Sequence, residues 1–321
     1  MRRALDYAWP VIGLLAVAFS LWILSRELGA LSAADVLAEM AAIAPSQYAL
    51  ALLATLGAYA MLAWYDRIAL LHLRVHHVSW PFVALTSFTT YALSHNIGAS
   101  VLSGAVVRYR AYSSVGLGAR QIAVLVAFCS FTFTLGAVTL GGLLLVFFPD
   151  MLARVGGGLP EAITLSGQAI GILMLGFVGL YVAGSLMRLR PLQLGGFRLD
   201  YPRPGITARQ IAASCLDNLA TAAIVFVLLP PETNPGYLIV LAVFLASFSA
   251  ALVSHAPGGL GVFELVFVAA LPEIPDAKLV AALVLFRLFY LLGPLAIGLV
   301  VVAVFERARL AEILRGRRRE G

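Results

Sequence analysis

Long apolar runs separated by short polar loops cover most of the chain. A helix of roughly 20 apolar residues is long enough to cross the hydrocarbon core of a bilayer. The pattern therefore predicts an all-α integral membrane protein that forms a single membrane domain over residues 1–321. Six full spans are expected, at 8–25, 47–71, 119–148, 165–187, 207–229 and 277–304.

Two further apolar regions, 81–112 and 237–272, are interrupted near their middles. The interruptions are SHNIGAS at 94–100 and SHAPGGLG at 254–261. Proline and closely spaced glycines end helices. The arms on either side, about 14 to 19 residues long, are mostly too short to cross a bilayer alone. We expect each region to form a re-entrant helical hairpin that enters the membrane and returns to the same side.

The two interruptions lie in similar sequence, and this similarity indicates an internal repeat. Seven of the 16 positions in 83–98 are identical in 243–258, and the flanking apolar runs also superpose. The first repeat begins with an inward span and the second with an outward one, so the hairpins are expected to have opposite orientations. Many transporters have such an inverted-topology repeat; the alternative is coincidental reuse of Ser, Phe and Gly. The expected units are a peripheral first span at 8–25, repeat 1 at 47–148, a linking span at 165–187, repeat 2 at 207–304 and a basic tail at 305–321.

Basic residues gather on one side of the expected spans, the side that carries both termini. This side holds 18 of the 22 lysines and arginines, all except Arg26, Arg154, Lys278 and Arg287. By the positive-inside rule it is the cytoplasm. The chain is 61% hydrophobic and only 12% charged, whereas a soluble domain has about a quarter of its residues charged. The net charge of +6 does not indicate a nucleic-acid partner, because the basic residues lie in short loops between apolar runs.

The helix breaks carry the first group of candidate site residues. A broken helix exposes backbone N–H and C=O groups that are costly in hydrocarbon, and a helix N-terminus suits an anionic group such as phosphate. Gly258 and Gly259 leave the backbone open to close approach. For His95 and His255, capping of a helix end and contact with a substrate are both open interpretations.

Ionisable residues inside the spans form the second group, because each buried charge costs at least about 2.5 kcal/mol unless it pairs or lines a cavity. Asp217, Glu264 and Arg287 fit either a structural ion-pair cluster or a transport site. Asp66 and Arg108 fit either an entrance pair or an interface salt bridge. The full set of candidate substrate-binding and transport residues is Asp66, Ser94, His95, Asn96, Arg108, Arg110, Asp217, Ser254, His255, Pro257, Gly258, Gly259, Glu264 and Arg287.

Three segments of the chain resemble a known family. They are WYD at 64–66, GASVLSGAVVRYRAY at 98–112 and SHAPGGLGVFE at 254–264. They are similar to the transmembrane domain of bacterial lysylphosphatidylglycerol synthases, also called multiple peptide resistance factor, over about residues 45–305. The resemblance implies a flippase-type domain of the bacterial inner (plasma) membrane that moves aminoacylated or other phospholipids between leaflets.

The resemblance also implies roles for individual residues. Asp66 matches the acidic residue of the YD element, and Arg108 matches the arginine after the first break. The Pro-Gly-Gly and Glu elements correspond to Pro257, Gly258, Gly259 and Glu264. The chain ends at Gly321 after an arginine-rich stretch, without the soluble aminoacyl-transferase domain of the full-length synthases, so no synthase activity is expected. The identity of the lipid is left open.

The predicted function is flippase-like translocation of phospholipids through a polar midplane cavity between the two hairpins. The alternative is a secondary transporter of a small anion or amphiphile. No Walker-type loop occurs, so transport would be facilitated or driven by an ion gradient, with the proton as the candidate coupling ion. Loss of charge at Asp66 or Arg108 is expected to abolish transport without loss of folding.

Other function classes receive less support from the sequence. An enzyme is not expected, because no HExxH or GxSxG pattern appears and the Ser-His neighbours are merely adjacent in sequence. Cys129 and Cys215 both lie inside apolar runs, so neither a disulfide, a metal site nor any other cofactor is predicted. A homo-oligomer and a scaffold for partner proteins are both compatible with the sequence.

Overall fold

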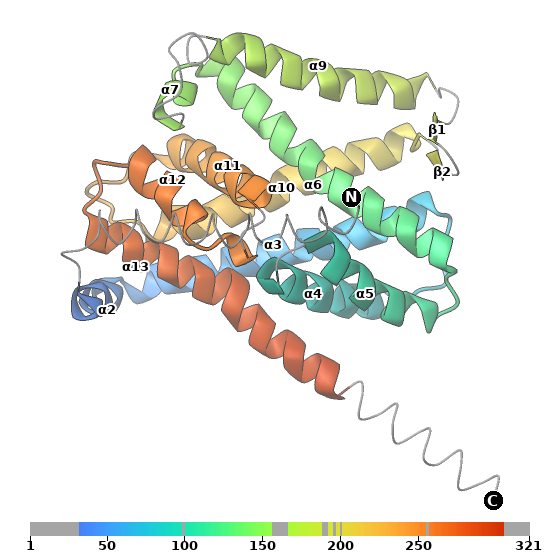
Figure 1. Cartoon of the computed structure of the whole chain (residues 1–321), viewed down its shortest axis with the longest axis horizontal. Helices are drawn as coiled ribbons and strands as arrows, with labels where there is room; N and C mark the ends of the chain where they lie inside the picture. Colours follow the sequence, from blue (N-terminus) through green and yellow to red (C-terminus); the bar gives the residue numbers. More distant parts are fainter. Residues whose placement is uncertain are drawn as a thin grey trace, which may run out of the picture.

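The structure is a computed structural model of the whole chain. It describes residues 32–97, 100–155, 166–187, 192–194, 197–199, 201–254 and 257–304 (Figure 1). The expected first span at 8–25 and the basic tail at 305–321 lie outside these residues. The described helices are α2 (Ala33–Ala42), α3 (Pro45–His72), α4 (Trp80–Ile97), α5 (Ser100–Ser113), α6 (Ala119–Phe147), α7 (Met151–Val155), α9 (Gly167–Leu186), α10 (Pro204–Leu228), α11 (Tyr237–Ser254), α12 (Val262–Ala270) and α13 (Asp276–Arg287).

Two irregular helical segments and one small sheet complete the described part of the chain. A 3-10 turn, η1 (Pro257–Gly259), precedes α12, and a π-helical segment, η2 (Leu288–Leu292), continues α13. The strands β1 (Leu192–Leu194) and β2 (Phe197–Leu199) pair antiparallel in the loop between α9 and α10. Every described apolar segment is helical, as predicted. The β-strands of the described part of the chain are confined to the β1–β2 pair.

Among the described residues, six helical segments are long and apolar enough to cross a membrane. Five of them match predicted spans: α3, α6, α9, α10 and the continuous segment Asp276–Val304. The sixth is α11, which was predicted as the first arm of a hairpin too short to cross alone. It runs for 18 residues up to Ser254, long enough by length and composition to span. The number equals the predicted six but the membership differs, because α11 is counted and the predicted span at 8–25 lies outside the described residues.

The centre of the molecule is the pair α3 and α10, which pack along one another (Figure 1). Small residues allow this approach, as where Gly57 faces the Cβ of Ala220. Helix α6 packs against both α3 and α10, and α9 covers α6 at one edge of the molecule. Large apolar side chains point outward from α9, among them Leu173 and Leu180, about three-quarters exposed. An outer surface of this kind suits lipid hydrocarbon rather than water.

Both interrupted regions fold as pairs of packed helices. Helix α4 packs against α5, and α11 packs against α12. The second break depends on glycine, because Gly258, Gly259 and Gly261 have φ angles of 59°, 65° and 79°. This left-handed region is costly for residues with a side chain. The chain therefore leaves the helical path between α11 and α12.

The end of α4, at the first interruption, lies next to the glycine turn of the second. Helix α4 contacts η1 although about 160 residues separate them. A Cβ placed on Gly258 would lie 3.8 Å from the carbonyl oxygen of His95 and 3.9 Å from that of Asn96. The end of α4 therefore meets the glycine turn that precedes α12.

We expect Gly136→Ala to destabilise the contact between α6 and α10. A Cβ at Gly136 would lie 2.5 Å from Ser214 Cβ and 2.6 Å from its backbone carbonyl, so the helices must separate. Overpacking of this kind costs typically about 1–3 kcal/mol. The measurement is the unfolding midpoint of the purified protein in detergent. The matched control is Gly176→Ala in α9, where nothing lies within 4 Å; equal midpoints for the two variants would contradict the prediction.

Candidate functional site

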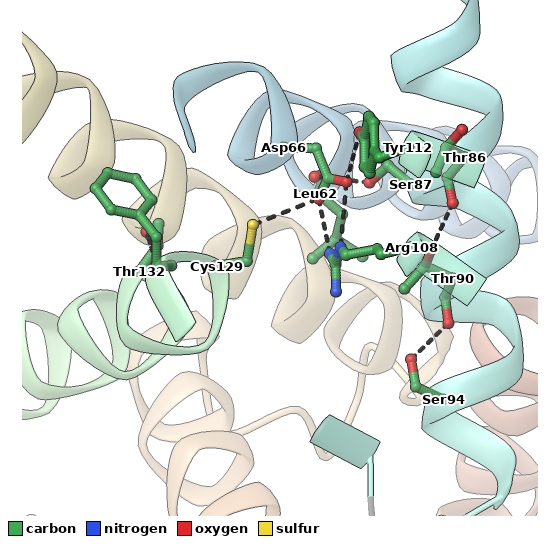
Figure 2. A network of polar contacts seen from close by, with 11 residues as sticks. Leu62, Asp66, Thr86, Ser87, Thr90, Ser94, Arg108, Tyr112, Cys129 and Thr132 are labelled. Atoms are coloured by element: carbon green, nitrogen blue, oxygen red, sulfur yellow. Dashed lines mark hydrogen bonds and ion pairs between the residues drawn. The ribbon is translucent and has the colours of Figure 1, made fainter. Parts of the chain in front are cut away.

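The first polar cluster surrounds Asp66, which is fully buried in α3. Arg108 of α5 forms a two-pronged ion pair with it: Nη2 donates to Oδ1 at 2.7 Å and Nε to Oδ2 at 3.2 Å. Tyr112, one turn further along α5, donates its hydroxyl to Oδ2 at 2.9 Å. Cys129 of α6 directs its thiol to Oδ1 at 3.4 Å. Figure 2 shows the four donors converging on the carboxylate. Both oxygens of the Asp66 carboxylate thus accept hydrogen bonds from the protein.

Arg108 is held on its other side by α4. Its guanidinium lies 4.8 Å from the ring centroid of Tyr91 in α4, a distance suited to a cation–π interaction. Gly104 lets α5 approach closely, since a Cβ there would lie 3.2 Å from Thr90 Cγ2 and 3.3 Å from Ser94 Oγ. The Asp66 cluster therefore ties α3, α4, α5 and α6 together.

Hydroxyl groups along α4 are satisfied within the protein. Ser94 donates to the carbonyl of Thr90, and Thr90 donates to that of Thr86 (Figure 2). Ser87 instead donates across to the carbonyl of Leu62 in α3, at 2.9 Å. Ser94, a predicted substrate contact, thus already uses its proton within its own helix.

The second polar cluster lies at the second break. The guanidinium of Arg287 pairs with Glu264 and donates through Nη1 to the carbonyl of Gly258 at 2.9 Å and through Nη2 to that of Gly259 at 3.4 Å. The other oxygen of Glu264 accepts the N–H of Gly261 at 2.9 Å and so caps the start of α12. The side chains of Arg287 and Glu264 are 14% and 13% exposed, more than those of the Asp66 pair. The backbone groups that were predicted to be free at this break are thus partly hydrogen-bonded to the side chains of Arg287 and Glu264.

The predicted cluster of Asp217, Glu264 and Arg287 is only partly formed. Asp217 makes no ion pair within the described part of the chain. Its Oδ2 accepts the hydroxyl of Tyr65 at 2.8 Å. The reason is that Asp217 faces α3 from α10, whereas Arg287 turns toward the glycine break.

His95 and Asn96 lie between the two clusters. Asn96 Nδ2 donates to Leu291 O at 3.1 Å, and Tyr59 donates its hydroxyl to Tyr290 O at 3.0 Å. Both acceptors belong to the π-helical segment η2, where the usual backbone pattern is interrupted, and such segments are frequent at functional sites. His95 stacks on Tyr290, with ring centroids 5.4 Å apart. The end of α4 is thereby fastened to the middle of the last span.

Four predicted residues remain, of which Arg110, Ser254 and Pro257 fall within the described part of the chain. Arg110 is exposed, since it lies two positions from Arg108 and therefore on a different face of α5. Ser254 ends α11 and donates to the carbonyl of Ala251. His255 lies outside the described residues, and Pro257 is described only as the first residue of η1.

Sequence reasoning missed the aromatic and thiol partners of the charged residues. Tyr112 lies four residues after Arg108 and therefore on the same face of α5, a spacing that could have indicated it. Cys129 was considered only as a ligand or disulfide partner. Tyr65 was noted only as part of the WYD element, and nothing in the sequence indicated the partners of Tyr65 or Tyr91, because these lie on other helices.

Fold and site together define a polytopic α-helical membrane protein with charged side chains buried among its spans. No protein-family model matches the chain. It is 29% identical over 296 residues to the uncharacterized protein slr0712 of Synechocystis sp., covering 92% of this chain and 90% of that protein. It is also 29% identical over 262 residues to inner membrane protein YbhN of Escherichia coli, covering 80% of each. Homology to an inner membrane protein and the six apolar helices support a membrane location.

Proposed function

We propose that the protein is a flippase-like translocator of phospholipids between the leaflets of the bacterial inner membrane. The observation that carries the proposal is that the end of α4 meets the glycine turn before α12 next to a mostly buried ion pair, Arg287 with Glu264. Intramembrane charges at helix breaks are expensive and typical of substrate pathways. The resemblance of segments 64–66, 98–112 and 254–264 to a flippase-type domain favours the same function.

In this proposal α4–α5 and α11–α12 are re-entrant hairpins of opposite orientation in an inverted repeat. The packing supports it, because α3 contacts α4 and α6 in the same way that α10 contacts α11 and α13. Both termini are then cytoplasmic. A fluorescent protein that folds only in the cytoplasm, fused after Gly321, is expected to be bright; a dark fusion with normal protein levels would contradict this orientation.

We propose that the Arg287–Glu264 pair recognises the lipid head group by exchange of partners. A phosphate would take the place of the Glu264 carboxylate on the Arg287 guanidinium, and the freed carboxylate would receive a cationic group of the lipid. The exchange conserves charge pairing, so neither residue is left as an unpaired ion in a low-dielectric site. Asp66 and Arg108, which are more deeply buried, would hold the first hairpin against α3 instead of contacting lipid.

The test is a leaflet-resolved assay in proteoliposomes with labelled phospholipids. The panel contains a zwitterionic lipid, an anionic lipid and an aminoacylated lipid with a cationic head group. Translocation is expected to be faster than in protein-free vesicles, and fastest for a head group carrying both phosphate and amine. The matched control is Arg110→Gln, which removes an exposed arginine and is expected to preserve the rate. No acceleration for any lipid would overturn the proposal and favour a transporter of small anions or amphiphiles.

A further inference from the structure

Asp217 is a buried carboxyl group that the head-group site does not use. It lies near the middle of α10, is 1% exposed and faces α3. The hydroxyl of Tyr65 donates to its Oδ2, but its Oδ1 has no hydrogen-bond partner in the described part of the protein. The contrast with Asp66 is direct, because Asp66 receives bonds from a guanidinium, a hydroxyl and a thiol.

The surroundings of Asp217 favour a neutral group. An ionised carboxylate without a cationic partner is expensive in an apolar interior, whereas a protonated carboxyl group is an ordinary polar group there. The described elements that pack against α10 place no lysine or arginine in an ion pair with it. The ionisable side chains on those elements and on the neighbouring α4 are Tyr48, Tyr59, Tyr65, Asp66, Arg67 and His72 on α3, Tyr91 and His95 on α4, Arg120 and Cys129 on α6, Tyr181 on α9, Tyr237 on α11, and Asp276, Lys278, Arg287 and Tyr290 on the last span.

Rings connect Asp217 to the first helix break. Tyr65 contacts Tyr91 with centroids 6.5 Å apart, and Tyr91 contacts His95 at 5.5 Å. Tyr91 also lies against the guanidinium of Arg108. A change in the charge of Asp217 would therefore alter the position of Tyr65 and, through the ring contacts, that of Tyr91 and His95 at the end of α4.

We propose that Asp217 is a proton-binding site and that its occupancy is coupled to movement of the helix breaks. A proton from the aqueous phase forms an O–H bond at the carboxylate and is released again as a proton, with no other bond made or broken. Protonation weakens the hydrogen bond that Tyr65 donates, because a neutral carboxyl oxygen is a poorer acceptor than a carboxylate. Proton binding stands on the geometry alone; the coupling rests on the proposed translocation function.

Infrared difference spectroscopy of the purified protein over a range of pH tests proton binding. The wild type is expected to show a carboxylic acid C=O band that disappears as the pH rises and is missing in Asp217→Asn. His95 gives no such band, so its titration does not interfere. The control Glu232→Gln, which removes an exposed carboxyl group, is expected to keep the band. An unchanged band in Asp217→Asn would overturn the proposal.

Tyr65→Phe provides a second variant that keeps the ring and the carboxyl group. It removes a donor that stabilises the ionised form, so the band is expected to persist to a higher pH than in the wild type. An unchanged titration midpoint would overturn the proposal, because Tyr65 would then not be acting on the titrating group.

Proteoliposomes with an imposed pH gradient test the coupling. The wild-type rate of lipid translocation is expected to change with the gradient, and the rate of Asp217→Asn to be the same with and without it. A gradient response that persists in Asp217→Asn, or a response to a sodium gradient alone, would overturn the coupling while leaving lipid translocation intact. Conversely, a normal infrared band in a wild-type protein that moves no lipid would contradict the proposed function and leave the proton site standing.

Discussion

Arg108→Met is expected to destabilise the protein by about 3–5 kcal/mol, the usual cost of removing one partner of a buried ion pair. Methionine fills a similar volume but leaves the carboxylate of Asp66 with only a hydroxyl and a thiol as donors. Asp66 is fully buried, so water cannot replace the guanidinium. The measurement is the unfolding midpoint in detergent, together with the fraction of protein inserted in the membrane. Arg110→Gln, which alters an exposed arginine, is the matched control.

The double variant Asp66→Asn with Arg108→Met distinguishes a structural role of this ion pair from a role in transport. With both charges removed, much of the lost stability is expected to return, because no unpaired ion is left in the interior. Recovery of stability together with transport would identify the pair as structural, in line with the proposed division of roles. A single variant as stable as the wild type would show that the bidentate pair contributes little. The sequence alone led to the opposite expectation, that loss of either charge leaves folding intact, and the unfolding midpoint of Arg108→Met decides between the two.

The sequence predicted the described spans well because each span is a local property. Twenty apolar residues in a row form a helix in lipid whatever surrounds them. The breaks were also visible, since Gly258 and Gly259 adopt backbone angles that other residues avoid. Helix α11 has 18 residues, within the roughly 14 to 19 predicted for an arm, and its length and composition also allow it to span.

Partnerships between helices were only partly predictable. The pairing of Asp66 with Arg108 was expected, with its role as an entrance pair or an interface salt bridge left open, and two further donors that no pattern indicated join it. Asp217 was grouped with Arg287 because both are deep in their spans, but depth does not determine which way a helix face points. The bond between Tyr65 and Asp217 joins residues 152 positions apart, and only the packing of α3 on α10 brings them together.

The hydrogen-bond partners at the second break were likewise not predictable from the sequence. Exposed N–H groups at the start of α12 were predicted as an anion site from the helix dipole. Glu264, three residues into the helix, instead accepts the N–H of Gly261. An anionic ligand must therefore compete with the protein's own carboxylate. This competition makes Arg287 the residue whose loss should affect transport most.

Arg287→Gln is expected to abolish lipid translocation and to destabilise the protein by about 1.5–3 kcal/mol, the range for hydrogen bonds to charged groups. The shorter amide cannot reach Glu264 and both glycine carbonyls at once, so the turn at 258–259 loses its main side-chain donor. Arg287→Lys keeps the charge without the planar fork and is expected to retain part of the stability but little transport. The measurements are the proteoliposome rate and the unfolding midpoint, with Lys278→Gln in the same helix as the control.

The neutral pair Glu264→Gln with Arg287→Met distinguishes a head-group site from a structural brace. If the pair recognises phosphate by exchanging partners, the double variant should recover stability in part, because it buries no unpaired charge, while its translocation rate stays at the level of protein-free vesicles. A double variant that moves lipid as fast as the wild type would remove the pair from the mechanism. The Arg287 guanidinium would then serve only to satisfy the carbonyls of a glycine turn, and the pathway would have to run elsewhere.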